Sequence, residues 1–345
     1  MKAAYLEDVG KLEIREMDKP QCPTDSLLIK VEACAVCGTD VKVFHYGHRL
    51  IQFPRVTGHE LAGTVVETGP ESKGFAEGDR ITVAPAVPCG ECIYCRDGIQ
   101  GMCDNLMAIG YHWDGGFAEY MAVPSRAVRT GCVSIIPDNV SFETAALTEP
   151  LAVAINCQEI SPVKLGSTVV IMGAGPLGCI HADVAKANGA AKVIMVEVSS
   201  KRLRQAGICR ADVFVNGSEE NSVERVLAET NNRGADVIIV ACSSGAAQED
   251  ALRMVCKRGH VNFFGSLPKD KSVISLDSNT VHYKECFISG THGSTPQQND
   301  LALSLLSGGN ISVDKYITHR LPLDDLIKGL EIVEKGEGLK VIINP

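Results

Sequence analysis

Two hydrophobic patterns divide the chain. In residues 1–35 and 61–83, short apolar runs alternate with glycine- and proline-containing turns, which is typical of β-strands joined by loops. From residue 167 onward, apolar runs rich in β-branched residues alternate with stretches of helical spacing. That alternation is typical of a parallel sheet with helical crossovers. The pattern therefore predicts an α/β protein, in which a loop-rich, all-β domain precedes a doubly wound domain.

The doubly wound domain is predicted from six apolar runs, with helical stretches between them. The runs are residues 167–172, 192–196, 212–215, 236–240, 260–264 and 285–289. Six strands with right-handed crossovers make a complete Rossmann sheet.

The end of the chain is too short to fold alone. Beyond Gly290 it holds two helical stretches, 299–306 and 324–335, and one apolar run, 340–343. We expect this remainder to return to the first domain. The predicted domains are 1–155 completed by 291–345, and 156–290.

A further helical stretch, 142–158, is apolar except for Glu149. Pro150 disfavours helical geometry for the residue before it, which predicts a break at Glu149. A buried carboxylate is costly unless it is paired or bound to a metal. Glu149 therefore lies either at a solvated helix end or beside a metal ion.

Composition excludes several classes of protein. The chain has 345 residues, a net charge of −9 and a pI near 5.5, so it has no basic excess with which to bind nucleic acid. The N-terminus lacks the apolar core of a signal peptide, and no apolar run has membrane-spanning length. We therefore expect a cytoplasmic protein with no membrane partner. Its 14 cysteines are then expected to be metal-bound or buried thiols rather than disulfides.

Four of these cysteines form a metal-binding pattern, C-x₂-C-x₂-C-x₇-C. They are Cys89, Cys92, Cys95 and Cys103. Four thiolates within one short lobe are typical of a structural zinc site, whose closed shell leaves no position for substrate. An iron–sulfur cluster also accepts four cysteines, but the x₇ gap departs from the ferredoxin pattern. Zinc is therefore favoured.

A second metal site is indicated by Cys37 and His59, which stand in the sequences Cys-Gly-Thr-Asp and Gly-His-Glu. Cysteine and histidine are preferred zinc ligands, and a catalytic zinc has three protein ligands and one open position. The third ligand must come from elsewhere, and Glu149 is one candidate.

A dinucleotide fingerprint follows the apolar run 167–172. The sequence from Gly173 through Gly175, Pro176 and Leu177 to Gly178 opens a helical stretch, and an acid, Glu197, follows the third glycine by nineteen residues. Glycines let the backbone approach a pyrophosphate, and the helix N-terminus favours its charge. A carboxylate at Glu197 favours NAD over NADP, whereas the neighbouring Lys201 and Arg202 are expected to flank the adenine or to be solvated.

Together these motifs resemble the zinc-dependent medium-chain alcohol dehydrogenase superfamily, in particular its sorbitol (polyol) dehydrogenase branch. The resemblance covers essentially the whole chain. It rests on the motifs beginning at Cys37, Gly58, Cys89, Gly115, Thr148 and Gly173. It implies a GroES-like catalytic domain split by a Rossmann NAD-binding domain, and a homodimer or homotetramer.

The resemblance also implies the site residues. A catalytic zinc would be held by Cys37, His59 and either Glu60 or Glu149, and Thr39 would pass the substrate proton outward while hydride goes to NAD. One departure is Lys42, which stands where relatives often carry the outer histidine of the proton relay. His45 or His48 could replace that histidine, and Lys42 could instead meet a substrate phosphate or be solvated.

The expected function is NAD-dependent oxidation of a secondary alcohol of a polyol such as sorbitol or L-iditol to a ketose. Two alternative activities are those of a polyol-phosphate dehydrogenase and an L-threonine 3-dehydrogenase. A catalytically silent NAD-binding relative is the non-enzyme alternative, and the presence of all the zinc-ligand candidates speaks against it. Trp113, the one tryptophan, either packs in the core or lines the substrate pocket.

Overall fold

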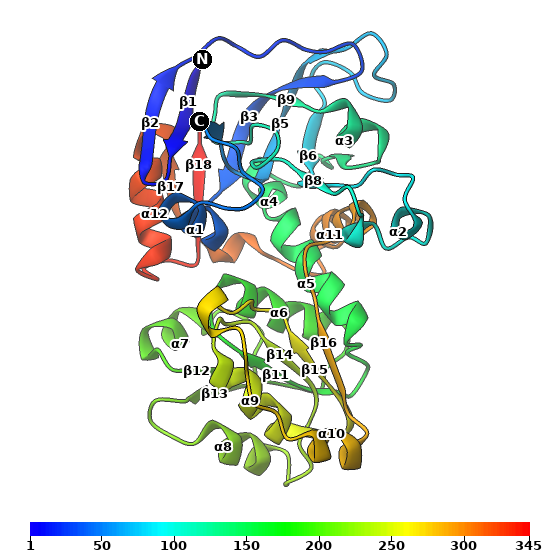
Figure 1. Ribbon diagram of the computed structural model, residues 1–345, viewed down its shortest axis with the longest axis vertical. Coiled ribbons are helices and arrows are strands. Elements are labelled where there is room, and N and C mark those ends of the chain that lie inside the picture. Colours follow the sequence, from blue (N-terminus) through cyan, green and yellow to red (C-terminus); the bar gives the residue numbers. More distant parts are fainter. The chain divides into compact units, whose positions relative to one another are not determined.

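The computed structural model describes all 345 residues, which form two compact units (Figure 1). The first unit consists of Met1–Ala152 and Gly293–Pro345, and the second of Val153–His292. The predicted domain limits, 155 and 291, lie within three residues of these divisions. None of the helices combines the length and the apolar character that a membrane crossing requires.

A seven-stranded sheet forms the centre of the first unit, in the order β10-β6-β5-β3-β18-β17 with β9 also paired to β3. Its strands are β3 (Leu27–Ala35), β5 (Glu60–Thr68), β6 (Arg80–Val83), β9 (Tyr120–Val123), β10 (Val133–Ile135), β17 (Ile317–Pro322) and β18 (Lys340–Asn344). Two smaller sheets accompany it: β1 (Lys2–Asp8) with β2 (Lys11–Glu16) and β4 (Arg55–Val56), and β7 (Ala86–Val87) with β8 (Met107–Ala108).

The end of the chain does return to this sheet. Ile342 and Ile343 of β18 pair antiparallel with Ala35 and Cys34 of β3, and Figure 1 shows the red β18 among the blue strands. Apolar side chains of β18 join those of β3 and β5 in one buried core. The helices α11 (Pro296–Ser307) and α12 (Leu326–Glu334) belong to the same unit.

The prediction that the N-terminal part is all-β is wrong in detail, because residues 38–46 form a helix. This helix, α1 (Gly38–Tyr46), begins after Cys37, whose backbone N–H donates to the Asp40 carboxylate at 2.9 Å. Its glycine and β-branched residues are weak helix formers, so local propensity gave no signal. Shorter helices are α2 (Ile93–Arg96), α3 (Ser125–Arg129) and α4 (Phe142–Ala146).

The predicted break at Glu149 is also misplaced. The chain bends at Leu147, between α4 and α5 (Thr148–Ile160). Pro150 is the third residue of α5, within the first turn, where a backbone N–H has no partner inside the helix. The proline therefore fits the start of α5, and Glu149 lies in the same turn.

The second unit has the predicted Rossmann sheet, in the order β13-β12-β11-β14-β15-β16 with all neighbours parallel. Its strands are β11 (Thr168–Met172), β12 (Lys192–Glu197), β13 (Val213–Asn216), β14 (Ala235–Val240), β15 (Val255–Phe263) and β16 (Phe287–Gly290). Its further helices are α6 (Pro176–Ala187), α7 (Ser200–Ala206), α8 (Ser222–Glu229), α9 (Gly245–Met254) and α10 (Ser278–Lys284). The central strands are nearly continuous apolar runs because helices such as α6 and α9 pack on them.

Candidate active site and metal centres

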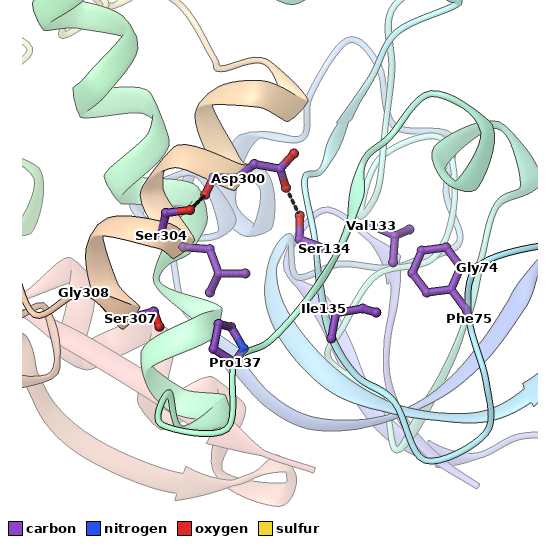
Figure 2. Close-up of a pocket in the computed structure, with 11 residues that line it drawn as sticks. Gly74, Phe75, Val133, Ser134, Ile135, Pro137, Asp300, Ser304, Ser307 and Gly308 are labelled. Carbon is purple, nitrogen blue, oxygen red and sulfur yellow. Dashed lines mark hydrogen bonds between the residues drawn. The ribbon is translucent and has the colours of Figure 1, made fainter.

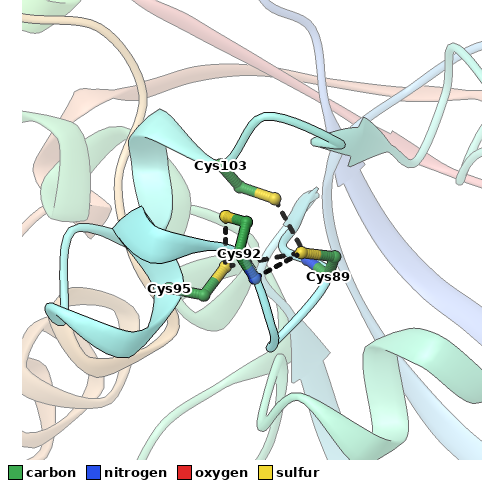
Figure 3. Close-up of side chains that lie close together, drawn as sticks. All are labelled: Cys89, Cys92, Cys95 and Cys103. Atoms are coloured by element: carbon green, nitrogen blue, oxygen red, sulfur yellow. Dashed lines mark hydrogen bonds between the residues drawn. The ribbon is translucent and has the colours of Figure 1, made fainter.

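The four-cysteine lobe brings its sulfur atoms together (Figure 3). All four lie within 4.8 Å of one another, and the Sγ atoms of Cys92 and Cys95 are 3.5 Å apart. In a tetrahedral zinc site with Zn–S bonds of about 2.3 Å, neighbouring sulfurs are about 3.8 Å apart. The observed separations fit a single zinc ion.

The backbone of the lobe also favours thiolates. Backbone N–H groups of Glu91 and Cys92 point at Cys89 and lower the pKa of its thiol to about 6. Cys103 accepts the N–H of Cys89 at 3.2 Å. Since zinc binds the thiolate form, these donors prepare the lobe for metal.

Cys37, His59 and Glu60 form the second cluster, with one ligand atom from each within 4.8 Å of the others. The sheet brings them together, because Ala35 at the end of β3 pairs with Glu60 at the start of β5. In this antiparallel register the residues just beyond β3 and just before β5 leave the sheet at the same edge. Thiolate, imidazole and carboxylate are the donors of a catalytic zinc, so the residues fit that ion.

Asp40 orients this cluster, a role that the sequence did not reveal. Its Oδ2 accepts the N–H of Cys37, and its Oδ1 lies 3.4 Å from Nδ1 of His59. Burial lowers the pKa of His59, but the Asp40 carboxylate, together with Tyr111 and Cys37, outweighs this effect, and the pKa stands well above its ordinary value. A carboxylate on one ring nitrogen leaves the other nitrogen free to face a metal.

Glu149 lies close enough to the cluster to interact with its charges. Burial and the neighbouring Glu60 carboxylate raise the pKa of Glu149 to about 7. Glu60, however, is the carboxylate that converges with Cys37 and His59. Of the two carboxylates left open by the sequence, the geometry thus brings Glu60 into the cluster and leaves Glu149 beside it.

Lys340 is a second residue that sequence reasoning missed. It is the first residue of β18 and donates through Nζ to Oε2 of Glu60, and both side chains are buried. The partners are 280 positions apart in the chain. No local motif could have indicated this contact, which depends on the return of β18 to the sheet.

Thr39 is half-buried beside the cluster, with its Oγ1 3.6 Å from Sγ of Cys37. The residues considered for the outer relay diverge. Lys42 is exposed, and His45 pairs with Glu334 at 3.2 Å. The ring of His48 instead lies edge-on to Tyr111 at 5.0 Å between centroids.

Two aromatic residues, Tyr111 and Trp113, lie in the loop after β8. Tyr111 lies 5.8 Å from the His59 ring between centroids, so it links His48 to the cluster. Burial raises the pKa of the Tyr111 hydroxyl well above its ordinary value, and the charged groups of the site, among them Cys37, also act on it. Trp113 packs against the hydrophobic core of its unit. Tyr111 is therefore the aromatic side chain found beside the metal ligands.

The glycine fingerprint forms a tight turn from β11 into α6. Gly173 has φ +112°, and a Cβ atom on Gly178 would come within 1.9 Å of the Gly173 carbonyl oxygen. Both positions therefore require glycine. Pro176 is the first residue of α6 and Leu177 the second, so free N–H groups of the first helical turn are available to a pyrophosphate.

Glu197 ends β12 next to this turn. Its Oε2 accepts the N–H of Ala174 at 2.9 Å, and its Oε1 accepts those of Val198 and Ser199. An Nη1 atom of Arg202 lies 3.9 Å from where a Cβ of Gly175 would be. The acid and the arginine thus lie at the turn where the adenosine half of a dinucleotide binds in Rossmann folds.

A separate cavity of about 770 Å³ lies between β10 and α11 in the first unit (Figure 2). Phe75, Ile135 and Leu303 contribute apolar surface to it. Its polar groups are already engaged, since the Ser134 hydroxyl donates to Asp300 at 2.5 Å. None of the predicted ligands lines this cavity, so the chemistry of the chain lies elsewhere.

Comparisons with known proteins identify the family of the chain. Residues 23–135 match the alcohol dehydrogenase GroES-like domain, and residues 176–308 match the zinc-binding dehydrogenase family. L-threonine 3-dehydrogenase of Photorhabdus laumondii is 34% identical over 337 residues, which are 95% of each chain.

Solved structures of similar proteins superimpose on the whole length of the chain. A zinc-binding dehydrogenase of Sinorhizobium meliloti, solved with NADP, superimposes with a TM-score of 0.93 at 32% identity and covers 100% of this chain and 99% of its own. 2R,3R-butanediol dehydrogenase of Bacillus subtilis superimposes with a TM-score of 0.91 at 26% identity and covers 100% and 99%. The chain therefore belongs to the zinc-dependent medium-chain alcohol dehydrogenase family and is an NAD(P)-dependent oxidoreductase.

Proposed function

We propose that this enzyme oxidises the secondary hydroxyl group of L-threonine or a closely related β-hydroxy amino acid to a ketone. The observation that carries the proposal is the likeness to an L-threonine 3-dehydrogenase over 95% of both chains. Sequence motifs had favoured a polyol and had kept threonine as an alternative. The comparisons support that alternative better than the polyol reading.

The residues of the cluster have distinct tasks in this reaction. A zinc ion held by Cys37, His59 and Glu60 would polarise the substrate hydroxyl and favour loss of its proton. Asp40 keeps His59 in one orientation. Thr39 has its hydroxyl beside Cys37 and can pass the proton outward, which is the role expected from its position in the motif.

We further propose that the cofactor is NAD. The carboxylate of Glu197 lies at the turn where the adenosine ribose binds, and a fixed negative charge there repels a 2′-phosphate. The S. meliloti structure holds NADP, so the preference of this chain has to be measured with both cofactors.

A polyol is the second candidate substrate. The sequence run that favours it, residues 149–153, lies in the first turns of α5, where Glu149 is near enough to Glu60 and His59 to feel their charges. A dehydrogenase of a vicinal diol is also among the structural neighbours. A phosphorylated polyol has weaker support, because Lys42, the side chain proposed to meet a phosphate, is exposed on α1.

The test is NADH formation from L-threonine, 2,3-butanediol, sorbitol, L-iditol and sorbitol 6-phosphate, each with and without a zinc chelator. Chelator-sensitive turnover with the highest kcat/KM for L-threonine is expected. His59→Ala serves as the matched control, because it removes a zinc ligand and leaves the nucleotide turn intact. Turnover confined to the polyols would overturn the threonine proposal but would leave the family assignment in place.

We also propose that the enzyme is a homodimer or homotetramer. β16 lies at the edge of the Rossmann sheet and exposes Phe287 and Ile288, which are 49% and 37% accessible. An apolar edge strand is a template for pairing with another chain. Light scattering coupled to size-exclusion chromatography tests this, and a mass of one chain would refute it.

A further inference from the structure

The buried ion pair between Lys340 and Glu60 needs an explanation beyond stability. Its side chains are 5% and 2% exposed. Removing two charges from water is costly, and apolar residues of similar volume often serve stability as well or better. A lysine at this position is therefore better explained by what it does to Glu60.

Lys340 holds one particular atom of Glu60. The ammonium donates to Oε2, so Oε1 is the carboxylate oxygen that this contact leaves free, and Glu60 offers one oxygen within 4.8 Å of the ligand atoms of Cys37 and His59. The charge of Lys340 also acts on Cys37 and Glu149, so the ammonium lies within range of the whole site. β18 fixes its position, because Ile342 and Ile343 are paired with β3, the strand that leads to Cys37.

A carboxylate with both oxygens free can bind a metal through both of them. A catalytic zinc, in contrast, needs three protein ligands and one open position for substrate. We propose that Lys340 is a positioning residue that restricts Glu60 to a single metal-facing oxygen and so keeps the metal four-coordinate, with three protein donor atoms and one exchangeable position for substrate. This inference concerns the metal site, and it holds whichever alcohol the enzyme oxidises.

Cobalt spectroscopy tests the inference without reference to substrate. The sample for this test is the protein loaded with Co²⁺ at the Cys37 site and with zinc at the four-cysteine site, and metal analysis checks that loading. Four-coordinate Co²⁺ has strong visible bands, and an added ligand weakens them. In Lys340→Met we expect Glu60 to bind through both oxygens beside the exchangeable ligand. The cobalt ion then has five donors, so the visible bands lose most of their intensity while the thiolate charge-transfer band of Cys37 remains. We also expect kcat to fall about 10- to 100-fold, the range known for residues that orient metal ligands.

Two further variants separate positioning from a structural role. Lys340→Arg still places a donor on Oε2 and should keep the strong bands. The double variant Lys340→Met/Glu60→Gln should regain them, because an amide has one carbonyl oxygen and cannot bind through two. A lysine that only stabilises the fold predicts no such recovery.

Unchanged visible bands in Lys340→Met, or weak bands in the double variant, would overturn the inference. Circular dichroism and zinc content check that each variant is folded and loaded. Should Lys340→Met fail to fold, the double variant still carries the test, because it removes both buried charges together. Neither result depends on whether L-threonine is the substrate.

Discussion

The buried histidine of the Rossmann unit gives the sharpest stability prediction. His181 lies in α6, is fully buried, and neither of its ring nitrogens has a hydrogen-bond partner. Its ring packs edge-on against Phe264 with 4.5 Å between centroids. Burial alone lowers the pKa of His181 from 6.5 to about 3.

This shift makes the unfolding free energy depend on pH. Between pH 6.5 and pH 3 the unfolded chain binds a proton at this site and the folded chain does not, so stability falls as the pH falls. The slope is about 1.4 kcal/mol per pH unit, and the loss from pH 6.5 to pH 5 is therefore about 2 kcal/mol. Above pH 7 both states hold a neutral imidazole and the contribution disappears.

The perturbation is His181→Leu, which keeps a similar volume and removes the titrating group. The difference in unfolding free energy between the variant and the wild type should be about 2 kcal/mol more in favour of the variant at pH 5 than at pH 7.5. Urea unfolding followed by circular dichroism at both pH values measures this difference, and the other titrating groups cancel in it. His282→Gln, at an exposed position in the same unit, is the matched control and should show no such difference. The reasoning would be refuted if the unfolding free energies of the wild type and His181→Leu differed by the same amount at the two pH values.

Three further changes have defined outcomes. Cys103→Ala should lose one of the two zinc ions per chain and should make residues 89–103 sensitive to trypsin, because one of the four sulfur ligands is missing. Metal analysis that still finds two zinc ions per chain would contradict this prediction. Thr39→Val should lower kcat by about 100-fold or more with zinc content retained, whereas Thr39→Ser, which keeps a hydroxyl group, should recover much of the loss. Equal kcat values in the two variants would exclude a proton-transfer role for Thr39. Glu197→Gln should raise the Kd for NAD about tenfold, as expected for the loss of a hydrogen bond to a charged group, and should reduce the preference of the enzyme for NAD over NADP. Titration calorimetry measures both Kd values, and unchanged values for both cofactors would count against Glu197 as the ribose-binding acid.

Secondary structure was predictable where pattern and local chemistry agree. The six strands of the Rossmann unit were found because parallel strands buried on both faces are nearly continuous apolar runs. Helix α1 was missed because its cap is a cysteine and its first residues are poor helix formers. The break near Glu149 was misplaced because the same proline that interrupts a helix is accepted within its first turn.

The sequence by itself determined the four-cysteine site, the nucleotide turn and the family. These two motifs are short segments whose residues must be close in space whatever the fold. The four cysteines lie within fifteen residues, and Gly173 to Gly178 form one turn. Tertiary structure alone decided which carboxylate joins Cys37 and His59, that Asp40 faces His59, and that Lys340 reaches Glu60. Those contacts depend on the register of β3 with β5 and on the return of β18, and register is set by packing over the whole sheet rather than by any local run of residues.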